Sequence, residues 1–175
     1  MARQSGVSIL SFLLALILAS VLLAITVAIG SHLLRQTNQN EAFQSVMVDV
    51  FQGIDAAISD QWQDSDCRAL SEPPTLQTLV SDYHVPASVL TSPYRIAVAY
   101  RTPSGATFSW AVKVSVTLPS EQSGYSLTRT AKRLADDVFV TERTITLYKG
   151  IASINSQLQH QYFDGETGCM QKDYE

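Results

Sequence analysis

The side chains best suited to chemistry in this sequence of 175 residues are three histidines and two cysteines. His32, His84 and His160 are far apart, and the H-E-x-x-H spacing that brings two histidines to one zinc ion is absent. The sequence also lacks a C-x-x-C pair, a G-x-S-x-G nucleophile turn and a glycine-rich phosphate loop. Its net charge of −4 disfavours nucleic acid, for which a basic face supplies the affinity. We therefore expect no enzyme, no metal or other cofactor, and no nucleic-acid partner.

A long apolar segment near the N-terminus is the first informative feature. No Lys, Arg, Asp or Glu occurs between Arg3 and Arg35, and residues 9–29 read ILSFLLALILASVLLAITVAI. At about 1.5 Å per residue, a helix of this length spans roughly 30 Å, the thickness of the hydrocarbon core of a bilayer. The hydroxyls of Ser11, Ser20 and Thr26 can bond back to helix carbonyls, so they do not prevent insertion.

Three kinds of segment fit this pattern. A cleaved secretory signal would use residues 28–30 as its cleavage site, but its apolar region is usually only about 7–15 residues long. An uncleaved signal anchor fits the length, with Arg3 held on the cytoplasmic side by the positive-inside tendency. The third kind depends on the residues that follow.

Those residues predict that the helix continues far beyond the apolar segment. From residue 42 to residue 62, apolar residues recur every three or four positions, the period of an amphipathic helix, and no proline occurs before Pro73. Gly30 and Gly53 each cost roughly 1 kcal/mol relative to alanine, too little to break a packed helix. We expect one helix over residues 7–62, apolar all round in its first half and with one apolar stripe in its second.

The rest of the chain predicts an α+β head. Residues 94–100 and 107–118 are expected to form an antiparallel hairpin, and residues 139–148 a third strand. Short helices are expected over residues 73–83 and 127–137, the latter with pairs Lys132–Asp136 and Arg133–Asp137, and again after Gly150. The aromatic side chains are expected in the core: Trp62, Phe108, Trp110, Phe139 and Tyr148.

The N-terminus followed by such a helix resembles the type IV pilin and pseudopilin superfamily. The matching residues are Met1-Ala2-Arg3-Gln4-Ser5-Gly6, a short basic leader ending in Gly, and the apolar run that begins at Val7. The resemblance implies a leader of residues 1–6, cleavage by prepilin peptidase after Gly6, and methylation of Val7. It further implies that residues 7–34 form the transmembrane and assembly half of the long helix. Residues 35–175 would then form the head, which includes the amphipathic half of the helix. Three strands would be fewer than the family's usual four or so.

The resemblance also implies a location and partners. The chain would lie in a bacterial inner membrane with its N-terminus cytoplasmic and its head periplasmic, and could enter a filament. Its partners would be other pilin or pseudopilin subunits, the peptidase and a filament assembly platform. One position departs from the family: Ser11 stands where most members have Glu, the fifth mature residue. That Glu is thought to neutralise a neighbour's N-terminal amine, so its absence resembles minor pseudopilins at a filament tip. It fits a bitopic, signal-anchored accessory protein equally well.

Cys67 and Cys169 lie in polar, turn-like contexts beyond the membrane segment. In an exported chain with an even number of cysteines, a disulfide between them is expected, and two free thiols are the alternative. Many pilins have a disulfide that closes the C-terminal region, which agrees with this pairing.

Overall fold

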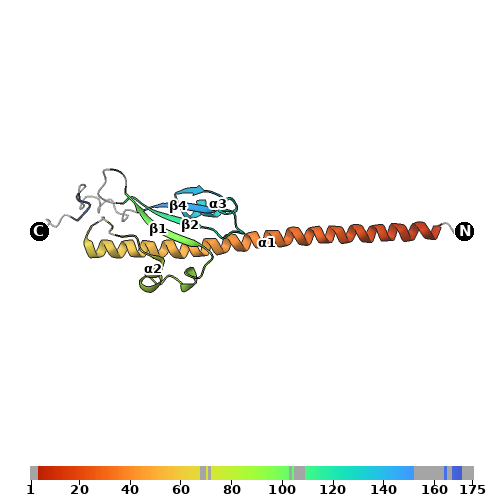
Figure 1. The fold of residues 1–175 in the computed structure, drawn as a ribbon, viewed down its shortest axis with the longest axis horizontal. Coiled ribbons are helices and arrows are strands. Elements are labelled where there is room, and N and C mark those ends of the chain that lie inside the picture. Colours follow the sequence, from red (N-terminus) through yellow and green to blue (C-terminus); the bar gives the residue numbers. More distant parts are fainter. Residues whose placement is uncertain are drawn as a thin grey trace. The chain divides into compact units, whose positions relative to one another are not determined.

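The computed structural model describes residues 4–67, 70, 72–102, 104, 109–151, 164 and 167–170. It is an α+β fold in which a long N-terminal helix packs against a small antiparallel sheet with short helices, as expected (Figure 1). The elements in order are α1 (Gln4–Ser65), α2 (Leu76–Asp82), the 3₁₀ helix η1 (Ala87–Val89), β1 (Arg95–Arg101), β2 (Ala111–Thr117), α3 (Gly124–Leu134), β3 (Asp137–Val140) and β4 (Thr144–Gly150). The chain divides into two units, one up to Glu41 and one from Ala42 onward.

The long helix α1 forms because nothing in its sequence interrupts it. No proline occurs within it, and it ends where Asp66 adopts a positive φ of 53°. The expected helix over residues 7–62 is therefore confirmed. Its second half buries one apolar stripe: Phe43, Met47, Val50, Ile54, Ala57 and Ile58.

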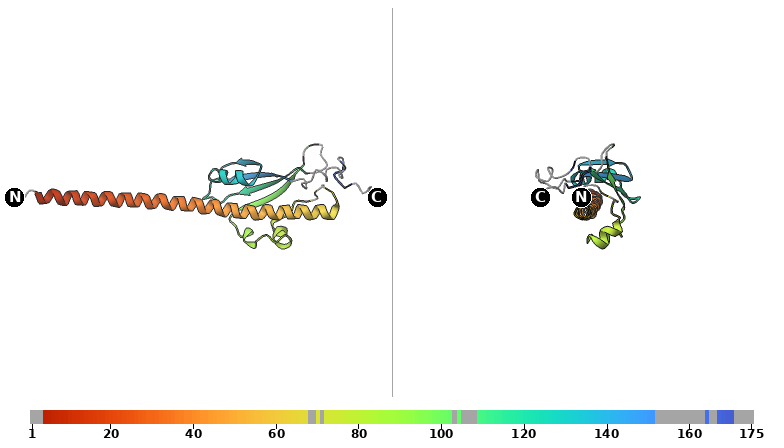
Figure 2. Two further views of the ribbon diagram at one scale, coloured as in Figure 1. Left: turned by 180° about the vertical axis from the view of Figure 1, so that it is seen from behind. Right: turned by 90° about the vertical axis from the view of Figure 1, so that its left-hand side faces the viewer.

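The sheet has four antiparallel strands in the order β1-β2-β4-β3. Val114 of β2 pairs with Val98 of β1 on one side and with Leu147 of β4 on the other. Because side chains alternate between the two faces of a strand, these positions share one face. Val114 and Leu147 are fully buried and belong to the same core as the α1 stripe. The views along and across α1 in Figure 2 show the sheet covering one side of this part of the helix.

The predicted third strand over residues 139–148 is wrong, because these residues belong to two strands joined by a turn. β3 and β4 form a hairpin in which the amide of Thr141 donates to the carbonyl of Thr144 at 2.8 Å. The Thr141 hydroxyl oxygen also accepts from the amide of Thr144 at 3.0 Å. A threonine side chain thus closes the turn, which has neither glycine nor proline to reveal it in the sequence.

The third helix, α3, lies three residues earlier than predicted, at each end. It packs against β3 and β4 through Leu127 and Ala131, both fully buried. Since α3 ends at Leu134, the predicted i,i+4 pairs of Lys132 and Arg133 with the two following aspartates do not form. Instead, the Asp136 carboxylate accepts a hydrogen bond from the amide of Gly150 at 2.7 Å.

The second helix, α2, packs on the side of α1 opposite to the sheet (Figures 1 and 2). It was predicted over residues 73–83 and begins at Leu76, because the Thr75 side chain caps it by accepting from the amide of Thr78. A Cβ at Gly53 of α1 would collide with Val85, which follows α2, so this close approach needs glycine. The helix expected after Gly150 falls on residues 152–163, outside the described residues.

Candidate functional site

The first half of α1 presents apolar side chains in all directions. Among the side chains that the structure describes between Ile9 and Leu34, fifteen large hydrophobic ones are each about half exposed or more. The helix is long and apolar enough to cross a membrane. Monomeric soluble proteins rarely expose contiguous apolar patches beyond a few hundred Å², so this surface needs a cover of lipid or protein. It is the most conspicuous candidate functional feature among the described residues.

The hydroxyl side chains of this segment bond to the helix itself. Ser20 donates to the carbonyl of Ile17 at 2.8 Å, and Thr26 donates to that of Leu23 at 2.8 Å. This is the pattern expected for hydroxyls in an apolar environment, because it leaves no donor unsatisfied. It confirms the expectation for these two residues.

The residues of the expected cleavage and assembly site also lie on α1. Gly6 and Val7 have helical backbone within its first two turns. Ser11 lies one turn further along, and its side chain is exposed on the apolar surface. A serine hydroxyl can donate or accept a hydrogen bond but carries no charge, so this position cannot neutralise an amine.

The cysteines form the predicted disulfide. The Sγ atoms of Cys67 and Cys169 are 1.99 Å apart, and 102 positions separate the two residues in sequence. The bond joins the segment just after α1 to the C-terminal region. A backbone hydrogen bond from the amide of Met170 to the carbonyl of Asp66 at 2.8 Å supports the same junction. The disulfide therefore closes residues 67–169, which include the sheet, into one covalent loop and ties the C-terminal region to the end of α1.

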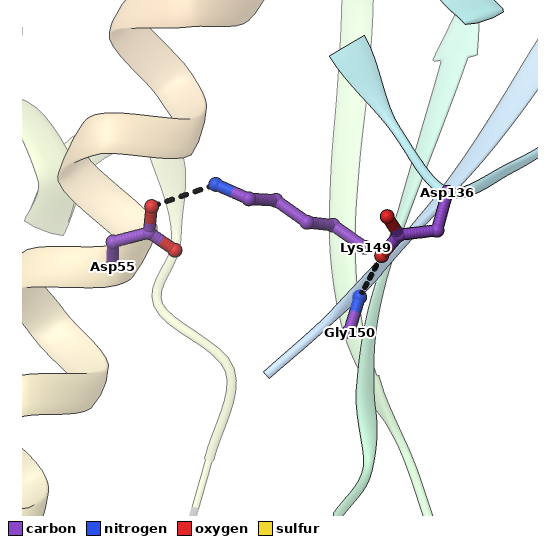
Figure 3. A network of polar contacts seen from close by, with 4 residues as sticks. All are labelled: Asp55, Asp136, Lys149 and Gly150. Atoms are coloured by element: carbon purple, nitrogen blue, oxygen red, sulfur yellow. Dashed lines mark hydrogen bonds and ion pairs between the residues drawn. The ribbon is translucent and has the colours of Figure 1, made fainter. Parts of the chain in front are cut away.

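An ion pair crosses from the sheet to α1 at the edge of the core (Figure 3). The Lys149 Nζ lies 2.7 Å from an Asp55 carboxylate oxygen and 5.2 Å from the centroid of the Phe51 ring. The pair lines an open cavity of about 330 Å³, together with Ile58, Ser59 and Trp62 of α1 and residues 150–151. Because both charged side chains are partly exposed, the pair contributes less than about 1 kcal/mol. The two charges of the pair satisfy each other.

Two of the five aromatic residues expected in the core lie on the surface. Trp110 is 61% exposed and Phe139 is 57% exposed. Trp110 precedes the first residue of β2, and Phe139 lies on the sheet face opposite to Val138 and Val140, which pack on the core. Trp62 is partly buried against the core, as expected. Tyr148 is only half-buried, and Phe108 lies outside the described residues.

Tyr83 and Tyr100 of the head have raised pKa values. Burial raises the pKa of Tyr100 to about 12. Partial burial and a hydrogen bond donated to Asp60 raise the pKa of Tyr83. Both phenols therefore stay protonated and neutral near pH 7. Among the described residues, no group of three His, Cys, Asp or Glu is arranged to hold a metal ion.

Comparison with known proteins gives no family for this chain. It matches no protein-family model, no curated protein and no solved structure.

Two features of the head were missed in the sequence. The pair of Lys149 and Asp55 could have been found from strand alternation, which places Lys149 on the same face as Ile145 and Leu147. The second feature is the exposed side of α3. It carries Arg129, Lys132 and Arg133, whereas the sequence had suggested that neighbouring aspartates neutralise two of these residues.

Proposed function

We propose that this chain is a minor pilin-like or pseudopilin-like subunit of a type IV pilus or type II secretion-type filament. It acts by assembly and catalyses no reaction. The observation that carries the proposal is one uninterrupted helix, Gln4–Ser65, with two different surfaces. Its first half exposes apolar side chains all round, and its second half buries a single stripe under a four-stranded sheet. Such a helix serves both as a membrane anchor and as the spine of a soluble head.

Two further features support this proposal. The head has four antiparallel strands, which matches the usual pilin sheet better than the three strands expected from the sequence. The disulfide between Cys67 and Cys169 closes the C-terminal region, as in many pilins. A head held together by a disulfide also suits an oxidising compartment such as the periplasm.

The proposal includes processing and placement in the cell. Prepilin peptidase cuts after Gly6, and Val7 becomes the methylated mature N-terminus. The chain crosses the bacterial inner membrane once, with Arg3 on the cytoplasmic side and the head in the periplasm. An assembly platform then moves it, with other pilin or pseudopilin subunits, from the membrane into a filament.

Ser11 supports a minor role within the filament. An amine at Val7 inside an apolar bundle needs a carboxylate nearby, because an unpaired charge is costly in such surroundings. A second copy of this chain offers only the Ser11 hydroxyl. A major subunit with Glu at the equivalent position could meet the amine, so this chain can join at a tip without building a shaft alone.

The N-terminal residue of the mature chain tests the proposal. The chain is purified from membranes that contain prepilin peptidase, and its N-terminal peptide is identified by mass spectrometry. A methylated peptide beginning at Val7 is expected, and Gly6→Ala or a peptidase deletion should leave the leader attached. A chain beginning at Met1 or Ala2 in the presence of active peptidase would contradict the proposal, and one beginning at Ser31 would indicate an ordinary secreted domain.

The second candidate is a bitopic, signal-anchored accessory protein of an envelope or secretion machine. Ser11 favours it as much as it favours a tip subunit, because an anchor that never enters a bundle needs no carboxylate there. An assay for the chain in filaments sheared from cells distinguishes the tip subunit from the accessory protein. With all partner subunits present, a tip subunit appears in the filament fraction in small amounts, whereas the accessory protein stays in the membrane.

A further inference from the structure

The exposed side of α3 is a basic surface. Tyr125, Arg129, Lys132 and Arg133 recur at intervals of four, three and one, so they lie on one face of the helix. All four are exposed, whereas Leu127 and Ala131 on the other face are fully buried. Helix α3 itself contains no Asp or Glu. Within the described part of the chain the one ion pair is that of Lys149 with Asp55, so none of the three cations is neutralised there. We call these four residues the basic α3 face.

The opposite side of the head is acidic. Between residues 42 and 94 the chain has seven Asp or Glu residues and a single Lys or Arg, whereas residues 95–151 have eight Lys or Arg and four Asp or Glu. Asp60 and Asp64 of α1 are both exposed and four residues apart, so they lie on one face of the helix, about 6 Å apart along its axis. This face is on the α2 side, since the Asp60 carboxylate accepts a hydrogen bond from Tyr83, which follows α2. We call Asp60 and Asp64 the acidic α1 line.

The two charged surfaces point away from each other. Helix α2 and helix α3 lie on opposite sides of α1 in both figures of the fold (Figures 1 and 2). A surface on one side of a molecule cannot meet its complement on the far side of the same molecule. It can meet that complement on a second copy, in a heterologous contact that repeats from one copy to the next.

The geometry points to a docking surface for a second copy of this chain: the basic α3 face of one head binds the acidic α1 line of its neighbour. This inference rests on the proposed function, in which anchored copies stand side by side with their heads in one compartment. The contact needs no carboxylate at position 11. It therefore lets copies associate in the membrane although Ser11 prevents them from forming a filament core by themselves.

The acidic neighbour fits this surface better than an anionic membrane does. Arg129 and Arg133 are four residues apart on α3, the same spacing of about 6 Å as that of Asp60 and Asp64 on α1. Tyr125 (65% exposed) adds a large amphipathic side chain of a kind enriched in protein interfaces. Complementary charges of this kind fix the register of two partners and suppress wrong pairings. Their attraction is screened by salt over about 8–10 Å at physiological ionic strength.

A photo-cross-linking experiment on the full-length chain tests the contact. Tyr125 is replaced by a photoreactive benzophenone amino acid, the chain is placed in nanodiscs of neutral lipid with several copies per disc, and cross-linked peptides are identified by mass spectrometry. We expect links to residues near Asp60 and Asp64 of a second copy, with a yield that falls as salt is raised from low to high concentration. Lys132→Glu with Arg133→Glu should lower the yield by about tenfold or more, because like charges then face each other.

A charge swap separates the contact from general repulsion. When the probe is on the double variant Lys132→Glu with Arg133→Glu, a second, unlabelled chain carrying Asp60→Lys with Asp64→Lys should restore the link. The matched control is Arg95→Glu with Lys113→Glu, which changes the net charge equally on the opposite face of the sheet and should keep the link. Links that survive the α3 reversal, that are not restored by the swap, or that form only to lipid when anionic lipid is added would overturn the contact. Because Val7 processing is measured on a different part of the chain, a normal mature N-terminus without this link would refute the contact alone.

Discussion

A buried charge in the α1 stripe gives the sharpest test of how the head is held together. Val50 is fully buried against the sheet, whereas Gln52, two residues along the same helix, is exposed. Val50→Asp and Gln52→Asp introduce the same side chain into the same helix. Differences in helix propensity are therefore small, and burial is what separates the two variants.

The magnitude of the Val50→Asp effect follows from two costs. To become buried at pH 7, the aspartate must be neutralised about three units above its ordinary pKa, which costs roughly 4 kcal/mol at about 1.36 kcal/mol per unit. Loss of the valine's apolar contacts adds about 1–2 kcal/mol. A total of roughly 5 kcal/mol is comparable to the whole stability of many domains, which lies at about 5–15 kcal/mol. Gln52→Asp should change stability by no more than about 0.5 kcal/mol.

The assay is chemical denaturation of the full-length chain in detergent micelles, followed by near-UV circular dichroism of the head. The Val50→Asp deficit should also depend on pH. The pKa of a buried aspartate in the folded state lies above its unfolded value of about 3.9, so the folded chain binds more protons and the deficit grows as pH rises from about 4 toward 7. Equal denaturation midpoints for the two variants at pH 7, or a Val50→Asp deficit independent of pH, would refute the packing of this stripe.

Three further perturbations probe other parts of the structure. Reduction of the Cys67–Cys169 bond, whose residues are 102 positions apart, should lower stability by about 4–5 kcal/mol in the loop-entropy description; unchanged thermal unfolding with reductant would contradict it, as would labelling of both thiols in unreduced protein. Gly53→Ala should destabilise the head although alanine favours helices by about 1 kcal/mol, since the new Cβ meets the segment after α2; Gly30→Ala, with no atom within 4 Å, is the control and should leave head unfolding unchanged. Since the pKa of Tyr100 is raised to about 12, the folded state holds its proton longer than the unfolded one, and stability should fall between about pH 10 and 12. Tyr100→Phe should reduce that fall, and an ultraviolet titration in which every tyrosine ionises by about pH 11 would show the reasoning to be wrong.

Periodicity explains what could be predicted from the sequence. The spacing of Phe43, Met47, Val50 and Ile54 indicated both the helix and its buried face, because one face of a long helix is reinforced at every turn. The alternation of Val112, Val114 and Val116 likewise identified the inner face of β2. Both signals are local, repeat many times and agree with the tertiary packing.

The failures of sequence reasoning share a different physical cause. The turn between β3 and β4 is closed by the side chain of Thr141, and threonine is also a good strand residue, so the sequence looked like one strand. Because the two strands were treated as one, Phe139 was expected to face the core, whereas it is exposed on the outer face of the sheet. Long-range hydrogen bonds flank both ends of α3: the amide of Gly124 donates to the carbonyl of Glu142, and the Asp136 carboxylate accepts from the amide of Gly150. Long-range hydrogen bonds of this kind leave no periodic signal.

The surface of α1 also indicates what decides whether this chain assembles. In a membrane, lipid covers the apolar side chains between Ile9 and Leu34; in a filament, the helices of neighbouring subunits would cover them. Lipid tails are as apolar as leucine, so exchanging one cover for the other changes the hydrophobic free energy little. Under the proposed function, the choice between the two states then falls to a few polar groups: the amine at Val7, the side chain at position 11 and the charged surfaces of the head. Because Ser11 carries no charge, two copies of this chain would lack the pairing between amine and carboxylate. Contacts between copies would then come from the head, and entry into a filament would depend on a subunit that supplies the carboxylate.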